Sequence, residues 1–277
     1  IGALWRQWRD VLGRMEFDTA AIDARLLTGH ALGLTALELA TRENEPVDGA
    51  AAERVAALLA RRMSGESVAR IIGQREFYGL AFSLNEATLE PRPETELLVD
   101  RALDALPADG QLLDLGTGTG CIPVAILVNR PGAHAVAVDL SARALAAAEI
   151  NAERHGVGAR LELLQGNWFD PLGAEDFDLI VANPPYITSS VIEALAPEVK
   201  DFDPRLALDG GPDGLAPYRI IASQAGGRLR PGGQILVEIG YDQGAAVSAL
   251  FAEAGFSGVS ITKDLNGLDR VVSGHYL

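Results

Sequence analysis

The feature that most constrains the fold is a regular alternation of short apolar runs with helical segments, which starts at Gln111 and continues to the end of the chain. Strands are expected at Leu112–Leu115, Ala135–Asp139, Leu161–Leu164, Asp178–Ala182 and Ile235–Ile239, followed by two late strands. Helices are expected at Ala142–His155, around Tyr218–Leu229 and at Ala245–Ala254. Strands that alternate with helices form a parallel sheet covered on both faces, so this order predicts an α/β fold. Ligands of such a sheet bind at the carboxyl ends of its strands.

The residues before this alternation show helical spacing and helix-capping residues instead. One segment opens at Asp18-Thr19 and ends at Gly33, and a second opens at Asp48 and ends near Gly65. The apolar face of the first segment is expected to comprise Ile22, Leu26, Leu27 and Ala31. This pattern predicts a small helical bundle.

The chain is therefore expected to contain two domains and a short connection. A helical domain is expected over residues 1–75, a hairpin or linker broken at Gly79 over 76–90, and the α/β domain over 91–277. Pro91–Glu96 is expected to begin the first helix of the α/β domain, because proline and acidic residues suit a first turn.

The composition argues against several classes of protein. A net charge of −15 provides no basic excess for binding phosphates, so direct nucleic-acid binding is not expected. No apolar run approaches the roughly 20 residues that a membrane span needs. One cysteine, Cys121, and scattered histidines show no metal-ligand spacing, so no metal is expected. The single cysteine and the lack of a visible secretory signal favour a cytoplasmic protein.

The first candidate site is the turn after the first strand of the α/β domain. Leu112–Leu115 runs into Gly116-Thr117-Gly118-Thr119-Gly120, and a helix follows. Glycines allow a tight turn and let a ligand approach the backbone closely. Asp139 ends the next strand, where its carboxylate can bind both hydroxyls of a ribose. This pattern predicts an adenosine-containing cofactor, but it does not separate S-adenosylmethionine from NAD.

Three further side chains are expected beside this cofactor. Asp114, next to the turn, can receive an amino group of the cofactor or cap the turn itself. Asn167 and Trp168 follow the third strand and suit the edges of an adenine ring, although Trp168 can equally belong to the core.

The most informative motif is Asn183-Pro184-Pro185-Tyr186, which follows the strand Asp178–Ala182. The two prolines lack an N–H, and proline holds the preceding residue extended, so the loop presents hydrogen-bond acceptors. The Asn183 side-chain oxygen and the Pro184 carbonyl can each take one hydrogen of a planar NH2 group, and Tyr186 can stack on that group. Such a grip suits methyl transfer to an amide-like nitrogen, whose proton leaves afterwards without a strong base.

With these residues in place, the chain resembles the release-factor glutamine methyltransferases of the PrmC/HemK family over nearly its whole length. The segments that carry the resemblance are Gly73–Gly79, Pro91–Glu96, Leu112–Gly120, Asn183–Tyr186, Ala207–Gly211, Asp213–Leu215 and Glu238–Gly240. The Asn-Pro-Pro-Tyr motif alone is shared with adenine-N6 and other amino methyltransferases. The Pro91–Glu96 and Ala207–Gly211 segments make the match specific.

The resemblance implies a seven-stranded, Rossmann-like catalytic domain and an N-terminal helical domain that meets the protein substrate. The implied reaction transfers a methyl group from S-adenosylmethionine to the glutamine amide of the Gly-Gly-Gln loop in class 1 peptide release factors, leaving S-adenosylhomocysteine. By resemblance, Gly116–Gly120, Asp139, Trp168 and Asn183 line the cofactor site, and Asn183–Tyr186 hold the glutamine. Many relatives have an acidic residue at position 167, where this chain has Asn167.

The motifs by themselves are compatible with more than one function. An adenine-N6 methyltransferase acting on DNA or RNA offers the same two acceptors to an exocyclic NH2, although the acidic charge disfavours it. A non-catalytic cofactor-binding protein and a methyltransferase of free small molecules also stay open. Arg92 can shape access to the site or be a surface arginine at a helix start, and Pro231-Gly232-Gly233 is interpreted as a turn before a strand.

Overall fold

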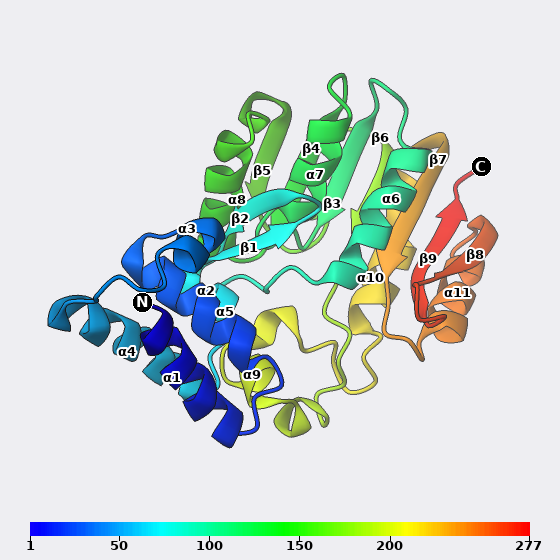
Figure 1. Cartoon of the computed structure of the whole chain (residues 1–277). Helices are drawn as coiled ribbons and strands as arrows, with labels where there is room; N and C mark the ends of the chain where they lie inside the picture. The colour runs from blue at the N-terminus through cyan, green and yellow to red at the C-terminus, as the bar shows by residue number, and fades with distance from the viewer. The chain divides into compact units, whose positions relative to one another are not determined.

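The computed structural model describes all residues from 1 to 277, and the chain forms two compact units (Figure 1). The first unit comprises residues 1–74 together with 197–202, and the second comprises 75–196 and 203–277. Nothing in the sequence pattern marks 197–202 as part of the first unit. No helix is both long and apolar enough to cross a membrane.

The first unit is helical. Its helices are α1 Gly2–Arg14, α2 Ala20–Leu32, α3 Ala36–Thr41, α4 Gly49–Met63, α5 Val68–Ile72 and the short α9 Pro197–Lys200. Two of the expected caps form, because Gly33 ends α2 with a φ of 65° and the Asp48 side chain accepts the Ala51 N–H at 2.7 Å. Thr19 precedes α2 without a side-chain cap hydrogen bond, and its hydroxyl donates to Asp23 instead. Leu12, Leu27, Val55 and Leu59 form the centre of its core.

The expected apolar face of α2 is half wrong. Leu27 is fully buried, but Ile22 and Leu26 are 62% and 49% exposed. The helix buries Ala20 and Ala24 instead. Small alanines allow close helix packing, and a pattern weighted towards large apolar side chains misses the face that they define.

A hairpin and a helix lie between the N-terminal helices and the first strand of the large sheet in the chain. Strands β1 Gln74–Phe77 and β2 Leu80–Ser83 pair, and the turn residues Tyr78 and Gly79 have φ values of 53° and 71°. Positive φ at both central residues is typical of the tight turns that match strand twist. A 3₁₀ turn at Pro93–Thr95 then leads into α6 Glu96–Ala105, as the proline pattern predicted.

The second unit is built on a seven-stranded sheet in the order β5-β4-β3-β6-β7-β9-β8. Its strands are β3 Gln111–Leu115, β4 His134–Asp139, β5 Leu161–Gln165, β6 Phe177–Ala182, β7 Leu229–Glu238, β8 Ser257–Lys263 and β9 Asp269–His275. The flanking helices after α6 are α7 Cys121–Asn129, α8 Ala142–Arg154, α10 Ala216–Ala225 and α11 Gly244–Glu253. Short 3₁₀ turns occur at Gly158–Arg160, Ile192–Ala194, Arg205–Ala207 and Gly226–Arg228.

Two details of the sheet correct the sequence-based expectation. The sheet is not wholly parallel, because β9 runs antiparallel to β7, and β8 runs antiparallel to β9. Pro231-Gly232-Gly233 is not a turn before a strand, because β7 already starts at Leu229 and contains it. The register against β6 jumps from Leu229 to Gln234, and Gly232 has a φ of 84°, so the segment is a bulge inside β7.

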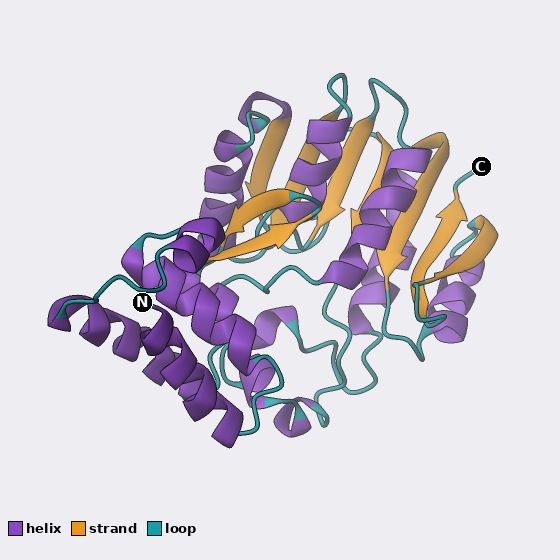
Figure 2. Cartoon of the chain, viewed as in Figure 1, coloured by secondary structure: helices purple, strands orange, loops and turns teal.

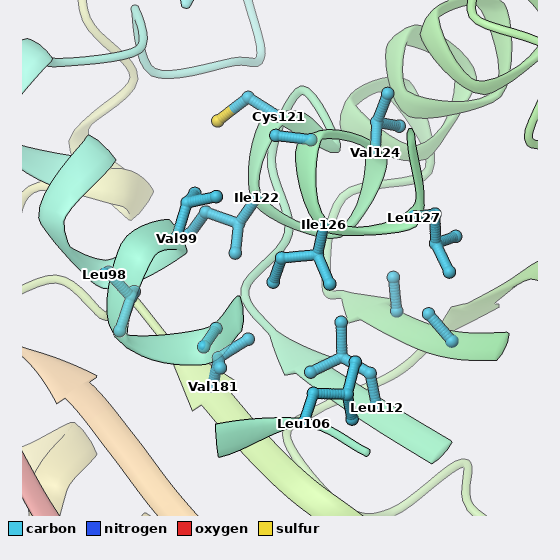
Figure 3. Packing of buried hydrophobic residues seen from close by; sticks show 14 of the residues in the cluster. Leu98, Val99, Leu106, Leu112, Cys121, Ile122, Val124, Ile126, Leu127 and Val181 are labelled. Atoms are coloured by element: carbon cyan, nitrogen blue, oxygen red, sulfur yellow. The ribbon is translucent and has the colours of Figure 1, made fainter. Parts of the chain in front are cut away.

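Helices cover both faces of the sheet (Figure 2). One face packs against α6, α7 and α8, and the other packs against α10 and α11. Figure 3 shows part of the first layer, where Val99 of α6 and Ile122 and Ile126 of α7 meet above Leu112 and Val181 of the strands. These layers fix where the parallel strands end, and that edge of the sheet carries the candidate site.

Candidate active site

A cavity of about 810 Å³ lies in the second unit, among the loops that follow β3, β4, β5 and β6. Of the residues predicted from the sequence, it is lined by Gly116, Gly118, Asp139, Asn167, Trp168, Asn183 and Pro185. Its size is that of a site for a small molecule or cofactor. The predicted loops therefore converge on one cavity.

The glycine turn has the backbone that only glycine adopts readily. Gly116, Gly118 and Gly120 have φ values of 77°, 55° and 75°. A Cβ at Gly118 would meet no protein atom within 4 Å, whereas a Cβ at Gly120 would lie 3.0 Å from the Ala148 Cβ. Gly118 thus leaves its backbone open to the cavity, and Gly120 allows α8 to pack closely. Gly120, Thr117 and Thr119 do not line the cavity.

The carboxylate of Asp139 is oriented by two backbone N–H groups, one from the glycine turn and one from the loop after β4. Its Oδ2 accepts the Gly118 N–H at 2.8 Å, and its Oδ1 accepts the Ser141 N–H at 2.8 Å. Burial raises its pKa, and these two hydrogen bonds oppose that rise. Each oxygen keeps a further lone pair for a hydroxyl group, so the carboxylate is oriented and still able to accept.

Asp114 is fully buried, and neither of its carboxylate oxygens has a hydrogen-bond partner. It does not cap the glycine turn, and it does not line the cavity. Burial raises its pKa to about 7, the nearby Thr117 hydroxyl lowers it, and the charge of Asp139 raises it further. Burial without hydrogen-bond partners destabilises an ionised carboxylate, so a cationic or hydrogen-bond-donating group near Asp114 would stabilise it.

Trp168 and Asn167 both face the cavity from the loop after β5. Trp168 is half-buried, packs against the core and has a φ of 50°. Positive φ is rare for a residue with a large side chain, so the surrounding structure holds this indole in place. Trp168 therefore both packs against the core and lines the cavity, so the two interpretations of this residue hold together.

The loop after β6 presents Asn183 to the cavity from a fixed position. The Asn183 Nδ2 donates to the Thr95 Oγ1 at 3.2 Å, and Thr95 is 2% exposed. Tyr186 is largely buried, and burial raises its pKa to about 12, so its phenol stays neutral. Pro184 and Tyr186 do not line the cavity, whereas Pro185 does.

A second loop, residues 207–215, is bound to the Asn-Pro-Pro-Tyr loop by backbone hydrogen bonds. The Ile187 N–H donates to the Leu208 carbonyl at 3.0 Å, and the Gly210 N–H donates to the Ile187 carbonyl at 2.8 Å. A Cβ at Gly210 would lie 2.8 Å from the Pro185 carbonyl oxygen. Gly210 is thus required by close backbone contact between the two loops.

Gln243 joins these loops to the end of β7. Its Nε2 donates to the carbonyls of Tyr186 at 3.0 Å and Gly214 at 3.1 Å, and its Oε1 accepts the Gly240 N–H at 2.9 Å. The side chain is 9% exposed. Its carboxamide therefore fixes three backbone segments to one another.

Arg92 does not line the cavity. Its guanidinium donates to the Asp203 Oδ2 at 2.6 Å, and the side chain of Asp203 is 2% exposed. Cys121 is buried, which raises the pKa of its thiol to about 12, so it is an unreactive packed residue.

Sequence reasoning missed several cavity residues. They are Ala87, Leu89, Val138, Leu140, Ser141, Gly166, Ser189, Pro204–Ala207, Asp209–Gly211, Ala216, Pro217 and Ile220. Most of them come from loops without a contiguous chemical motif. The one available signal was the Ala207–Gly211 segment, which the family resemblance singled out without giving it a role.

Comparison with known proteins agrees with this architecture. The profile of the PrmC N-terminal domain matches residues 3–73, and that of the methyltransferase small domain matches residues 92–198. The release factor glutamine methyltransferase of Caulobacter vibrioides is 46% identical over 98% of this chain and 94% of its own length. The protein of the same name from Cereibacter sphaeroides is 49% identical over 92% of this chain and 91% of its own. This chain belongs to the release factor glutamine methyltransferase family.

Solved structures of methyltransferases share the fold of this family member at low sequence identity. The methyltransferase from Pyrococcus furiosus superposes with a TM-score of 0.55 at 16% identity, covering 78% of this chain and 96% of its own. The hMettl16 catalytic domain, solved with an RNA hairpin, gives a TM-score of 0.58 at 15% identity, covering 83% of each chain. The chain is thus an enzyme of the methyltransferase class with a seven-stranded Rossmann-like domain.

Proposed function

We propose that this enzyme transfers a methyl group from S-adenosylmethionine to the side-chain amide nitrogen of the glutamine in the Gly-Gly-Gln motif of class 1 peptide chain release factors. The observation that carries the proposal is the anchored Asn183 carboxamide at the cavity, in a chain 46% identical to a release factor glutamine methyltransferase over 98% of its length. Since release factors act on ribosomes, we expect the enzyme in the cytoplasm.

The cavity fits S-adenosylmethionine, which would supply an electrophilic methyl group on a sulfonium. The oriented Asp139 carboxylate suits the two ribose hydroxyls. Gly116 and Gly118 leave room for a ligand against the backbone. The Asp114 carboxylate does not line the cavity, so its charge, and not a direct contact, would favour the amino group of the cofactor. Trp168 and Asn167 suit the adenine ring, because an indole can stack and an amide can hydrogen-bond to its edge.

The acceptor glutamine would be held by the Asn-Pro-Pro-Tyr loop. The Asn183 Nδ2 is engaged by Thr95, so its Oδ1 is available to accept one hydrogen of the glutamine NH2. The Pro184 carbonyl would accept the other hydrogen. Two acceptors on one planar NH2 fix the face of the nitrogen and make its lone pair more available.

The proton that the nitrogen loses need not be removed by a strong base, because the methylated amide is acidic while it is cationic. The neutral Tyr186 ring would lie against the flat acceptor group and exclude water.

The decisive experiment is incubation with isotope-labelled S-adenosylmethionine and either a purified class 1 release factor or adenine-containing DNA and RNA. Mass mapping of the products then locates the label. The proposal requires one methyl group on the glutamine of the Gly-Gly-Gln motif. Label on adenine, or none on the release factor, would overturn it.

A further inference from the structure

Glu238, the last residue of β7, lies directly behind the Asn-Pro-Pro-Tyr loop and is 2% exposed. The hydroxyl of the buried Tyr218 donates to its backbone carbonyl at 2.8 Å, which fixes the end of the strand. The Thr95 hydroxyl and the Asn183 carboxamide, which are hydrogen-bonded to each other, lie close enough to its carboxylate to lower its pKa, and one carboxylate oxygen, Oε2, has no hydrogen-bond partner. The proposed cofactor and acceptor contacts do not use this group.

The hydrogen bond between Asn183 and Thr95 has a defined direction. The Thr95 Oγ1 accepts a hydrogen from the Asn183 Nδ2, so the single Thr95 hydroxyl hydrogen is free to be donated to Glu238. An ionised carboxylate only accepts hydrogen bonds. Both groups behind Asn183 therefore present acceptors to it, and this places the NH2 end of its carboxamide inward.

We propose that Glu238 is a positioning residue that selects the orientation of the Asn183 carboxamide, and thereby turns the Asn183 Oδ1 towards the acceptor nitrogen. This inference rests on the proposed function for its catalytic consequence. When Glu238 is ionised, an inward Oδ1 would meet a carboxylate without a donor. When Glu238 is protonated, it can donate to an inward Oδ1, and the outward Nδ2 then repels the acceptor NH2.

The surroundings place this change near neutral pH. Burial raises the pKa of Glu238 to about 7, against the lowering effect of the Thr95 hydrogen bond and the Arg270 charge. The charged or titratable groups that face it are Glu94, Arg270, Tyr186, Tyr218 and Cys121. Burial raises the pKa of each of the last three well above neutral, so Glu238 is the member of this set expected to titrate near pH 7.

The kinetic test compares Glu238→Gln with wild type at saturating S-adenosylmethionine, so that ionisation of Asp114 does not limit cofactor binding. For wild type, kcat/KM for the release factor should rise with pH to a plateau above about 7. In Glu238→Gln it should be about tenfold lower than the plateau and independent of pH in this range, because a neutral amide no longer selects one orientation. The affinity for the cofactor should change less than about twofold.

Glu253→Gln, at an exposed position at the end of α11, is the matched control and should behave as wild type. Circular dichroism and thermal unfolding must show that Glu238→Gln is folded. Thr95→Val, which removes the hydroxyl between the two side chains, should also lower kcat while leaving cofactor affinity unchanged. A Glu238→Gln variant with the wild-type rate and pH profile would refute the positioning role.

A second measurement needs no substrate. The side-chain NH2 signals of Asn183, assigned by their loss in Asn183→Ala, should titrate with a midpoint of about 7 in ¹⁵N spectra of the free enzyme. This titration should persist in Asp114→Asn and vanish in Glu238→Gln. If it is seen in an enzyme that methylates no release factor, the proposed function fails while the Glu238–Asn183 coupling stands. If it is absent from an active enzyme, the coupling is refuted.

Discussion

At the scale of single residues, the candidate site contains groups that cost stability where they stand. Asp114 is buried with both carboxylate oxygens unpartnered, and Trp168 adopts a positive φ. Neither feature improves packing, and such costs commonly gather where a ligand must bind. Removing either feature should therefore raise the free energy of unfolding of the free enzyme.

Replacing Asp114 by Asn should stabilise the free enzyme in a pH-dependent way. The folded-state pKa is raised from 3.8 to about 7, so this group favours folding below its unfolded pKa and loses that contribution as the pH rises through about 7. Asn does not ionise, so the variant should gain stability over wild type between about pH 4 and 7 and keep the gain above that. Thermal unfolding across this range checks it, with exposed Asp170→Asn as control. A difference that does not change with pH would contradict it.

Replacing Asn183 by Ala should separate binding from chemistry. The carboxamide is anchored through its Nδ2, and its Oδ1 is the group proposed to hold the acceptor nitrogen. Turnover should fall about 100-fold, the usual cost of losing one preorganised polar contact in a transition state. Cofactor affinity, measured by calorimetry, should stay within severalfold. Equal losses in both quantities would indicate that Asn183 mainly supports the loop.

At the scale of elements, the sequence predicted the parts of the site that are contiguous in the chain. The glycine turn, Asp139 and the Asn-Pro-Pro-Tyr loop each follow a strand, and the edge of a parallel sheet brings them together. Thr95, Glu238 and Gln243 were not predicted, because each supports the loop from a different element and acts by a single hydrogen-bonding side chain. The resemblance segments Pro91–Glu96 and Glu238–Gly240 contain Thr95 and Glu238, but only tertiary packing shows that these side chains support the loop.

The same limit explains where the fold was misjudged. The direction of the last two strands, the bulge at Gly232 and the buried face of α2 depend on neighbours rather than on local periodicity. The parallel core of the sheet, by contrast, follows from the alternation of strands and helices along the chain, so the α/β class was correctly predicted.

The contact between the two loops of the site gives a prediction at this scale. A Cβ at Gly210 would lie within 3.0 Å of three backbone atoms, of Pro185, Tyr186 and Gly214, which cannot rotate away as a side chain can. Gly210→Ala should displace the Asn-Pro-Pro-Tyr loop and lower kcat by about 100-fold, as a misplacement of about 1 Å does. Gly227→Ala, where a Cβ meets nothing within 4 Å, is the control and should retain full activity. Wild-type activity in Gly210→Ala would contradict this, because it would show that the two loops can admit the Cβ without a loss of turnover.

At the scale of the whole molecule, the chain crosses between its two units more often than a simple two-domain order requires. Residues 197–202 belong to the first unit, although the residues on both sides belong to the second. Within the first unit, the buried Arg62 pairs with Asp23 at 2.7 Å and with Glu198 at 2.7 Å. Arg62 thus links the sequence-distant α9 segment to the N-terminal helices.

Arg62→Ala should therefore destabilise the first unit and release residues 197–202. It leaves Asp23, which is 5% exposed, without its cation, and breaking such a buried pair costs about 3–5 kcal/mol. Arg42→Ala removes only an exposed pair with Glu45 and should cost less than about 1 kcal/mol.

The chain has two lysines, Lys200 in α9 and Lys263 in β8, so a lysine-specific protease reports on each segment separately. Cleavage after Lys200 should accelerate in Arg62→Ala while cleavage after Lys263 stays at the wild-type rate, because Lys263 lies in the sheet of the other unit. Equal acceleration at both lysines would mean that Arg62 stabilises the molecule globally instead of holding this segment.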